Sequence, residues 1–516
     1  MSLKQYFRRN AYRWHRITSL VVALPILLWT ISGFLHPVMN SFKPDVRNQQ
    51  LPVSIIDTSK IRLTLNEAIA KHQIKQLDGF RIVKLFGAHY YQVRLKGQDT
   101  LSYISCYNAQ WLPHGDEQYA AYLAQRYLTE PNGKKSDGGH HGEVSANISE
   151  VTSLKKPAAH YEKPNISNVS LIRSFDQEYK KSNLLLPVYK VNFQRADGIR
   201  LYIETSSDRM ATSMDDKRAW YTAFFSFAHS WSFLNGLGDY KYLLLGAFSF
   251  LCFLSSVFGF YIYNITKRKN AVNSTQKLKN RHRIFGNIFV ATTLLYALSG
   301  GWHSLHKIGK EDPRKNYTVR NSYSVEKIDF DPVLASSYLK NKEKLFDASI
   351  VQMDGENYWQ LSISKEKEKY KRYIAVSTGK ELVDGDNKYG CYLACNFSGS
   401  NEHNITHSQC LKTFTNKYSM MNKRLPVIEV GFEGGENYYV ETSSSTLSAV
   451  VDPTDRMERF SFSNLHMHHY WEDWLGKSWG KTMRNSFLIA TTLGLLLLAL
   501  TGMLLYLKKK RAMKRI

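Results

Sequence analysis

The stretch WHRITSLVVALPILLWTISGFLH, residues 14–36, recurs later in the chain as NRHRIFGNIFVATTLLYALSGGWH, residues 280–303. Each copy is long and apolar enough to cross a membrane as a helix. Each copy also carries two histidines that are 21 positions apart. The corresponding residues are His15, Ser32, Gly33 and His36 in the first copy and His282, Ser299, Gly300 and His303 in the second. The repeat therefore predicts a membrane protein built from two related halves.

A third pair of histidines follows from a second repeat. The motif YIETSS, which begins at Tyr202, aligns with YVETSS, which begins at Tyr439, and the alignment runs without a gap to His229 and His466. Coordinating side chains at membrane depth are costly and usually functional, and imidazole is a common ligand of haem iron. We therefore expect a membrane b-type cytochrome with two haem b groups. The candidate ligands of the haem iron are His15, His36, His229, His282, His303 and His466.

The sequence leaves the pairing of these histidines open. One arrangement places an inner haem between His15 and His282. The other places both haems on the outer side, with His36 opposite His229 and His303 opposite His466. His15 and His282 could also be interfacial residues in basic flanks that contact lipid headgroups. Three more histidines crowd the outer region and blur the assignment, because they could substitute for His303 or His466 or bind substrate iron, namely His306, His468 and His469.

The composition indicates a mixture of membrane and water-exposed parts. A chain of 516 residues with a mean hydropathy of −0.37 is too long for one ordinary domain and too polar to consist mainly of spanning helices. Scanning for long apolar runs predicts four transmembrane helices. Their expected ranges are 17–36, 240–263, 284–305 and 486–507.

The distribution of charge predicts the orientation of these helices. Three segments without any acidic residue contribute 18 of the formal net charge of +25, and they are 1–16, 264–283 and 508–516. Because Lys and Arg near helix ends tend to stay in the cytoplasm, we expect both termini there. The segments 37–239 and 306–485 should then be periplasmic domains. The basic total is thus a topology signal, and no nucleic-acid partner is expected.

The two outward segments are themselves related, although faintly. YYQVRL from Tyr90 resembles YWQLSI from Tyr358, and LPVYKVNF resembles LPVIEVGF further along each segment. Both motifs alternate apolar and polar residues, as half-buried strands do, so we expect α+β domains with short antiparallel strands.

Four of the five cysteines fall in the outward segments, where disulfides are permitted. Spacing suggests a bridge within the group Cys391, Cys395 and Cys410, without fixing its connectivity or the state of Cys106. The chain has no nucleotide-binding fingerprint, P-loop or hydrolase nucleophile motif. It therefore carries no site of its own for a nicotinamide cofactor or ATP.

The helix motifs resemble those of the PepSY-associated transmembrane family. The relevant stretches are WHRITSLVVALPILLWTISGFLHP in the first span, the RHR and LSGGWH segments of the third, and LLLLALTGMLLYLKKK in the last. The resemblance implies an α+β protein of the bacterial inner membrane, with a four-helix bundle built as two repeated halves and two periplasmic PepSY-like domains. Some members resemble di-haem ferrisiderophore reductases, which implies haem b as cofactor and a ferric siderophore as substrate.

The function expected from these features is reduction of periplasmic Fe(III) during iron uptake. Electrons would come from quinol or from a partner reductase and pass through the haems. The alternative is a non-enzymatic membrane protein of the same family that binds peptides or assists an uptake system. The two possibilities differ in whether the purified protein carries a chromophore.

Overall fold

A computed structural model describes residues 3–129, 164–310, 318–366 and 368–513. The chain forms two compact units, each assembled from distant parts of the sequence. The helical unit comprises Met1–Lys43, Trp220–Glu311 and Pro453–Ile516, and the sheet unit comprises Pro44–Ala219 and Asp312–Asp452. The mixture of helix and sheet agrees with the expected α+β class.

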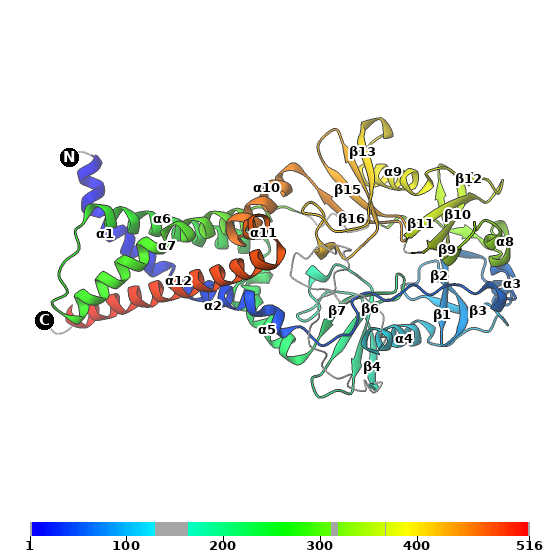
Figure 1. Ribbon diagram of the computed structural model, residues 1–516, viewed down its shortest axis with the longest axis horizontal. Coiled ribbons are helices and arrows are strands. Elements are labelled where there is room, and N and C mark those ends of the chain that lie inside the picture. The colour runs from blue at the N-terminus through cyan, green and yellow to red at the C-terminus, as the bar shows by residue number, and fades with distance from the viewer. Residues whose placement is uncertain (1–2, 130–163, 311–317, 367, 514–516) are drawn as a thin grey trace. The chain divides into compact units, whose positions relative to one another are not determined.

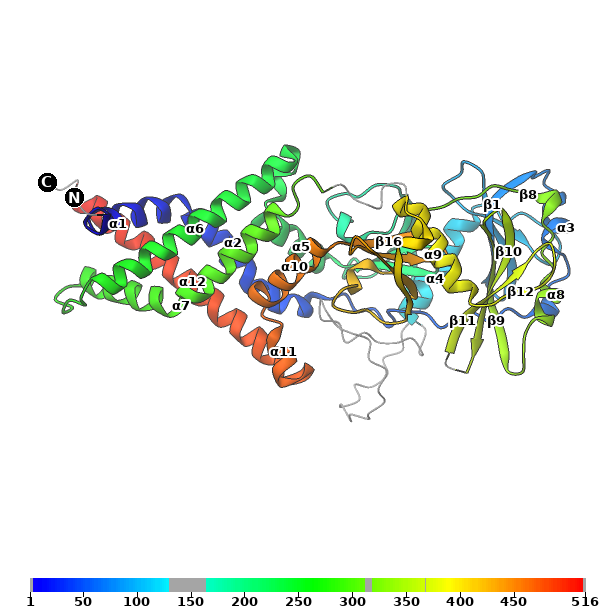
Figure 2. The same cartoon turned by 90° about the horizontal axis from the view of Figure 1, so that it is seen from above.

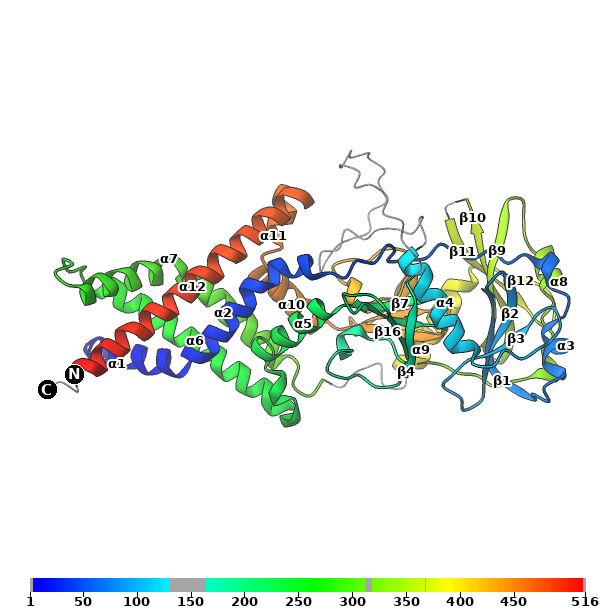
Figure 3. The same cartoon turned by 90° about the horizontal axis from the view of Figure 1, so that it is seen from below.

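The helical unit is built around five long helices (Figure 1). These are α1 (Leu3–Val21), α2 (Ala23–Val38), α6 (Asp239–Ile265), α7 (Ser274–Leu305) and α12 (Lys477–Met513). Helix α6 packs against α1 and α7, while α12 packs against α7 and α2. The same neighbours can be followed from above and from below (Figure 2, Figure 3). Shorter elements complete the unit, namely α5 (Asp216–Ala228), α10 (Pro453–Ser461), a π-helical turn (Phe462–His466) and α11 (Tyr470–Leu475).

Among the described residues, α6, α7 and α12 are each long and apolar enough to cross a membrane. The predicted first span, 17–36, falls on α1 and α2, which bend by 58° at a break and would together make a fourth crossing. Pro25 explains the break, because its ring clashes with the carbonyl of Val21, the last residue of α1.

The described residues of the sheet unit form four antiparallel sheets of four strands each. Their orders are β3-β2-β1-β8, β12-β11-β10-β9, β4-β5-β6-β7 and β13-β14-β15-β16. The strands of the first half are β1 (Gln76–Leu85), β2 (Ala88–Leu95), β3 (Ser102–Ser105), β4 (Ile166–Ile172), β5 (Val188–Phe193), β6 (Arg200–Glu204) and β7 (Arg209–Met214). Those of the second half are β8 (Tyr323–Ser324), β9 (Glu343–Met353), β10 (Glu356–Lys365), β11 (Glu368–Ala375), β12 (Glu381–Leu382), β13 (Ile405–Leu411), β14 (Val427–Phe432), β15 (Asn437–Glu441) and β16 (Thr446–Val451).

The repeat seen in the outward segments is a repeat of structure. The motif at Tyr90 lies on β2 and the motif at Tyr358 lies on β10, so the strands expected there are confirmed. Helix α4 (Gly115–Thr129) packs on β3 to β6, and α9 (Gly385–Ser398) packs on β11 and β13 to β16. Two short helices, α3 (Leu65–Ala70) and α8 (Pro332–Ser337), also occupy corresponding places.

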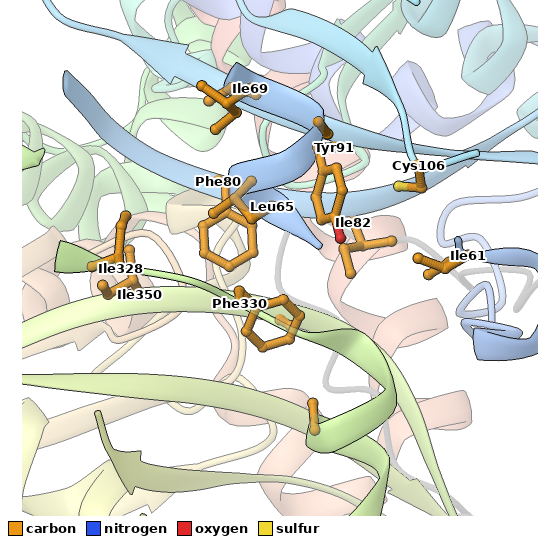
Figure 4. Close-up of a cluster of buried hydrophobic side chains, with 14 of the residues drawn as sticks. Ile61, Leu65, Ile69, Phe80, Ile82, Tyr91, Cys106, Ile328, Phe330 and Ile350 are labelled. Atoms are coloured by element: carbon orange, nitrogen blue, oxygen red, sulfur yellow. The ribbon is translucent and has the colours of Figure 1, made fainter. Parts of the chain in front are cut away.

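The two halves of the sheet unit share one core, although the sequence analysis treats them as separate domains. Strand β8 of the second half pairs with β1 of the first. The rings of Phe80 and Phe330 lie 5.2 Å apart between their centres, and Ile82 and Ile350 belong to the same buried cluster (Figure 4). Each half would expose this apolar face alone, so the halves fold together.

A buried ion network also joins the two halves. Arg424 bonds Glu204 at 2.9 Å and Glu441 at 2.5 Å, and Arg209 also pairs with Glu441. Burial alone would raise the pKa of Glu441, but the two guanidinium groups hold that pKa well below its usual value. The aligned residues Glu204 and Glu441 of the two ETSS motifs are therefore charged anchors of the unit.

All five cysteines are free thiols in the structure. Cys391 and Cys395 lie on α9, and Cys410 lies on the neighbouring strand β13. The bridge suggested by their spacing is therefore not formed here.

We expect Glu441→Gln to destabilise the sheet unit by about 3 kcal/mol, because it leaves two buried guanidinium groups with one carboxylate. Glu204→Gln is the matched control and should lower the free energy of unfolding by less. Among the described arginines, Glu204 forms an ion pair only with Arg424. Chemical unfolding of both variants, followed by circular dichroism, measures the difference. Equal losses would show that the network is not centred on Glu441.

Candidate functional site

Two histidines from α1 and α7 face one another inside the helical unit, and we call them the inner pair. The ring centres of His15 and His282 are 6.4 Å apart, with their planes at 49°. His15 Nδ1 donates to the carbonyl oxygen of Ser255 on α6 at 2.9 Å. His282 Nδ1 is hydrogen-bonded to Thr501 Oγ1 on α12 at 3.0 Å. Each ring is thus held by the helix that packs beside its own.

Glycines make room for the inner pair. A Cβ atom on Gly259 would lie 3.1 Å from Cε1 of His15, and one on Gly502 would lie 3.2 Å from Cε1 of His282. The sequence analysis missed both glycines because it aligned α1 with α7 but not α6 with α12. The signal is present in the match of FGFYIY, residues 258–263, with TGMLLY, residues 501–506.

A second pair, the outer pair, comes from the segments after α5 and α10. The ring centres of His229 and His466 are 6.3 Å apart, with their planes at 84°. His229 Nδ1 is hydrogen-bonded to Ser32 Oγ at 3.0 Å, and His466 Nδ1 to Ser299 Oγ at 3.1 Å. The repeated serines of the long helices therefore hold the outer histidines.

These hydrogen bonds determine which nitrogen of each ring carries the proton. The hydroxyl of Ser32 donates to the carbonyl of Leu28 at 2.7 Å, and the hydroxyls of Ser299 and Thr501 donate to carbonyls of their own helices in the same way. Because each hydroxyl proton is already used, the oxygen accepts from the imidazole Nδ1–H. In all four rings Nε2 therefore keeps its lone pair, which is the state that binds a metal.

The remaining two candidate histidines flank the outer pair. His303 stacks on Phe462 at 4.6 Å between ring centres, and Phe462 stacks on His466 at 5.0 Å. In the other half Phe225 lies between His36, at 5.9 Å, and His229, at 4.8 Å. The structure thus brings together His15 with His282 and His229 with His466, and it places His36 and His303 one phenylalanine ring away.

The two flanking histidines have different surroundings. His303 Nδ1 bonds the carboxylate of Glu458 on α10. His36 lies in the electrostatic range of Arg484 and His469 instead. The two halves are therefore related in sequence but not equal in charge.

Tyr296 is a further residue at the outer pair that sequence reasoning missed. Its ring centre is 5.4 Å from that of His466, and its hydroxyl is hydrogen-bonded to His468 Nε2 at 3.1 Å and to Thr491 Oγ1 at 2.9 Å. His468, which the sequence left as a possible substitute ligand, is thus engaged with Tyr296.

The outer pair is neutral at ordinary pH. Burial lowers the pKa of His229 to about 3, and His36, His303 and Lys307 act in the same direction. Burial also lowers the pKa of His466 far below its usual value, and the surrounding histidines add to the effect. Both rings are therefore available as uncharged ligands.

Some buried polar atoms of the helical unit have no hydrogen-bond partner. Within the described part of the helical unit they are Trp231 Nε1, His468 Nδ1, Trp471 Nε1 and Arg484 Nε. Buried polar groups are normally paired, so these four atoms are exceptions in the described helical unit. No cluster of three or more His, Cys, Asp or Glu side chains suited to a bare metal ion occurs among the described residues. Each histidine pair could instead supply two ligands to a metal whose other ligands come from a cofactor.

The family model described as the PepSY-associated TM region matches residues 136–509. No curated protein matches the chain.

We expect the metal-free and cofactor-free protein to lose stability as the pH falls from 7 to 5. In the unfolded chain His229 and His466 take up protons near pH 6.5, whereas in the folded protein they do so only at much lower pH. Well below pH 6.5, each of these two histidines should lower the free energy of unfolding by up to about 1.4 kcal/mol for each pH unit. Thermal unfolding at several pH values measures this slope.

Two variants test the source of that slope. His229→Gln should remove about half of the contribution of the outer pair. His403→Gln, which replaces an exposed histidine of the sheet unit, should leave the slope unchanged. An unaltered slope in His229→Gln would contradict the assignment.

Proposed function

The chain belongs to the PepSY-associated transmembrane family and is a membrane protein, and from this premise we propose that it holds two haem b groups and reduces Fe(III) outside the cytoplasm. The observation that carries the proposal is the pairing of four repeat-related histidines. Their ring centres are 6.4 Å apart in the inner pair and 6.3 Å apart in the outer pair. Two imidazoles on opposite sides of one iron, each about 2 Å from the metal, have ring centres roughly 6 Å apart.

The residues around the pairs fit a haem in two further ways. All four Nδ1 atoms are held by hydrogen bonds, which leaves Nε2 for the iron. Helices α1, α2, α6, α7 and α12 supply the apolar surroundings that such a macrocycle needs.

The two pairs lie at two depths. His282 of the inner pair lies on α7, and so does Ser299, which is hydrogen-bonded to His466 of the outer pair. The separation of His282 and Ser299 in sequence corresponds to roughly 25 Å along the helix axis. Haem bound at each level would supply one-electron redox chemistry on both sides of the membrane core. The chain itself contributes the ligands, fixes their orientation and keeps water away from both levels.

The proposed topology follows from the same helices. The bent pair α1 and α2 would make one crossing, and α6, α7 and α12 would make the other three, so that a four-helix bundle consists of two repeated halves. The basic segments 1–16, 264–283 and 508–516 would lie in the cytoplasm of a bacterial cell. The two halves of the sheet unit would be the periplasmic PepSY-like domains.

We take the substrate to be an Fe(III) chelate such as a ferric siderophore, as the family resemblance implies. Fe(III) prefers hard oxygen ligands, so one-electron reduction to Fe(II) weakens the chelate. The electron donor would be quinol or a partner reductase, because the sequence has no nicotinamide-binding motif.

The first test is a haem count on purified protein. We expect two haems per chain, with the sharp bands of bis-histidine haem in a reduced-minus-oxidised spectrum. His15→Ala and His466→Ala should each reduce the count to one, because each removes one ligand of one pair. His36→Ala and His303→Ala are the control variants, because these two candidate histidines lie outside both pairs, and each variant should retain both haems.

Two outcomes would contradict this map. A colourless protein made in cells with ample haem would favour the non-enzymatic alternative of the family. Loss of a haem in His36→Ala, with both haems kept in His15→Ala, would assign the ligands to the outer histidines alone.

The second test addresses the substrate. Protein reduced anaerobically should be reoxidised by a ferric siderophore, with one Fe(II) formed per haem oxidised. A ferrous-specific chelator added in excess would report the product, and a gallium siderophore is the control, since Ga(III) is not reduced under these conditions. Reduced haems that persist in the presence of the ferric complex would exclude it as the electron acceptor.

A further inference from the structure

Two lysines meet at one end of the helical unit, where α6 begins and α7 has just ended. Lys241 lies in the first turn of α6, and Lys307 follows the last residue of α7 by two positions. Their Nζ atoms lie 5.6 Å and 5.8 Å from the centre of the same ring, that of Tyr242, and the two charges are within electrostatic range of each other. Like charges at this separation repel, so an anion beside them would be stabilised.

Packing between α6 and α7 fixes the place of these lysines. The hydroxyl of Ser304 on α7 donates to the carbonyl oxygen of Tyr242 on α6 at 3.0 Å. A Cβ atom on Gly246 would lie 2.7 Å from Leu305 Cδ2, so the two helices also touch one turn further along α6. The lysines therefore belong to one surface that both helices form.

The carboxylates at this end of the unit are engaged elsewhere. Asp239 accepts the backbone N–H of Gly309 at 3.0 Å, and Asp455 binds His306 at 2.8 Å. Glu458 is within electrostatic range of Lys307, but its carboxylate is bonded to His303. Among the described residues, neither Lys241 nor Lys307 forms an ion pair.

The other half of the helical unit shows how such a cation is paired within the chain. The alignment that matches Gly259 with Gly502 also matches Lys241 with Arg484, and the alignment that matches His229 with His466 also matches Asn235 with Glu472. Arg484 lies 2.5 Å from the carboxylate of Glu472.

The first half makes the same contact with a neutral group. Lys241 Nζ donates to Asn235 Oδ1 at 2.8 Å, so an amide stands where the other half has a carboxylate. Lys241 is only 7% exposed, and a buried cation without a carboxylate is costly unless another anion compensates it. The negative charge that Glu472 supplies in one half has no equivalent at Lys241.

The surface beside the two lysines is apolar. Tyr240 and Leu244 on α6 are exposed, and so are Leu298, Trp302 and Leu305, which share one face of α7. In a membrane protein, exposed apolar side chains of this kind face acyl chains, and tyrosine and tryptophan gather at the level of the headgroups. This surface thus carries positive charge at its end and an apolar face along its length.

We propose that Lys307 and Lys241 bind the headgroup phosphate of an anionic phospholipid, whose acyl chains lie along the exposed faces of α6 and α7. Basic pockets between spanning helices bind anionic lipid headgroups in this way. Lys307 is exposed and reaches the phosphate directly, whereas Lys241 adds its charge from a position that water hardly screens. The proposal is independent of the haem groups.

A lysine near the end of a spanning helix ordinarily extends into the headgroup layer and stays accessible. Lys307 taken alone fits that description. Lys241 does not, because it is buried beside an amide and shares the ring of Tyr242 with a second cation. The pair is therefore a place for one particular anion and not a pair of independent headgroup contacts.

The test uses photoreactive lipids on the full chain in phosphatidylcholine vesicles. Phosphatidylglycerol and phosphatidylcholine probes with the same acyl chains are cross-linked, and labelled peptides are identified by mass spectrometry. We expect residues 239–250 and 298–309 to be labelled severalfold more by the phosphatidylglycerol probe, because the choline headgroup carries a positive charge of its own. The basic segment 264–283, at the other end of α6 and α7, serves as an internal reference for attraction by charge alone.

Three variants locate the effect. Lys307→Gln removes one charge, and Asn235→Glu gives Lys241 the carboxylate that Arg484 has in the other half. Each should reduce the preference for phosphatidylglycerol at this surface severalfold and leave the labelling of 264–283 unchanged. Lys477→Gln, which replaces an exposed lysine in the first turn of α12, should preserve the preference.

Three results would overturn the proposal. Equal labelling of this surface by the two probes in the wild-type chain would do so, and that comparison needs no substitution, so it decides even where a variant fails to fold. A preference that persists in both Lys307→Gln and Asn235→Glu would place the lipid elsewhere. Loss of labelling in the presence of excess glycerol 3-phosphate would assign the two lysines to a free phosphate instead of a lipid.

Discussion

The arrangement of the helical unit depends on one kind of contact, a hydrogen bond from imidazole Nδ1–H to an acceptor on a neighbouring helix. Ser255, Thr501, Ser32 and Ser299 provide these contacts. Each contact fixes the orientation of a ring and leaves Nε2 with its lone pair.

Duplication explains why these contacts occur in pairs, but the two halves have diverged in charge. The position of Glu458 in the second half is occupied in the first by Tyr221, whose hydroxyl donates to the Leu35 carbonyl at 2.9 Å. His303 consequently lies beside a carboxylate, and His36 lies in the electrostatic range of the Arg484 guanidinium. The charged groups beside His36 and beside His303 therefore differ between the two halves.

The sheet unit is also built from two repeated halves, but there the halves share one core. Each half has a long helix and strands in two sheets, and β8 of the second half completes the sheet of β1 to β3, so neither half covers its apolar face by itself. The contact between the rings of Phe80 and Phe330 and the ion network around Glu441 join the halves. Two copies of one motif have thus become a single unit whose core and charges are shared.

The sequence by itself determined the apolar spans, the basic segments, the strand motifs and the repeat that marks His15, His36, His229, His282, His303 and His466 as candidates. Only the tertiary structure decided which of them face one another, and only it revealed Gly259, Gly502 and the bend at Pro25 as features of the helix packing. The reason is physical. Spacing along a helix fixes depth and direction, whereas the partner of a ring depends on which helices are neighbours, and that is set by packing between segments hundreds of residues apart.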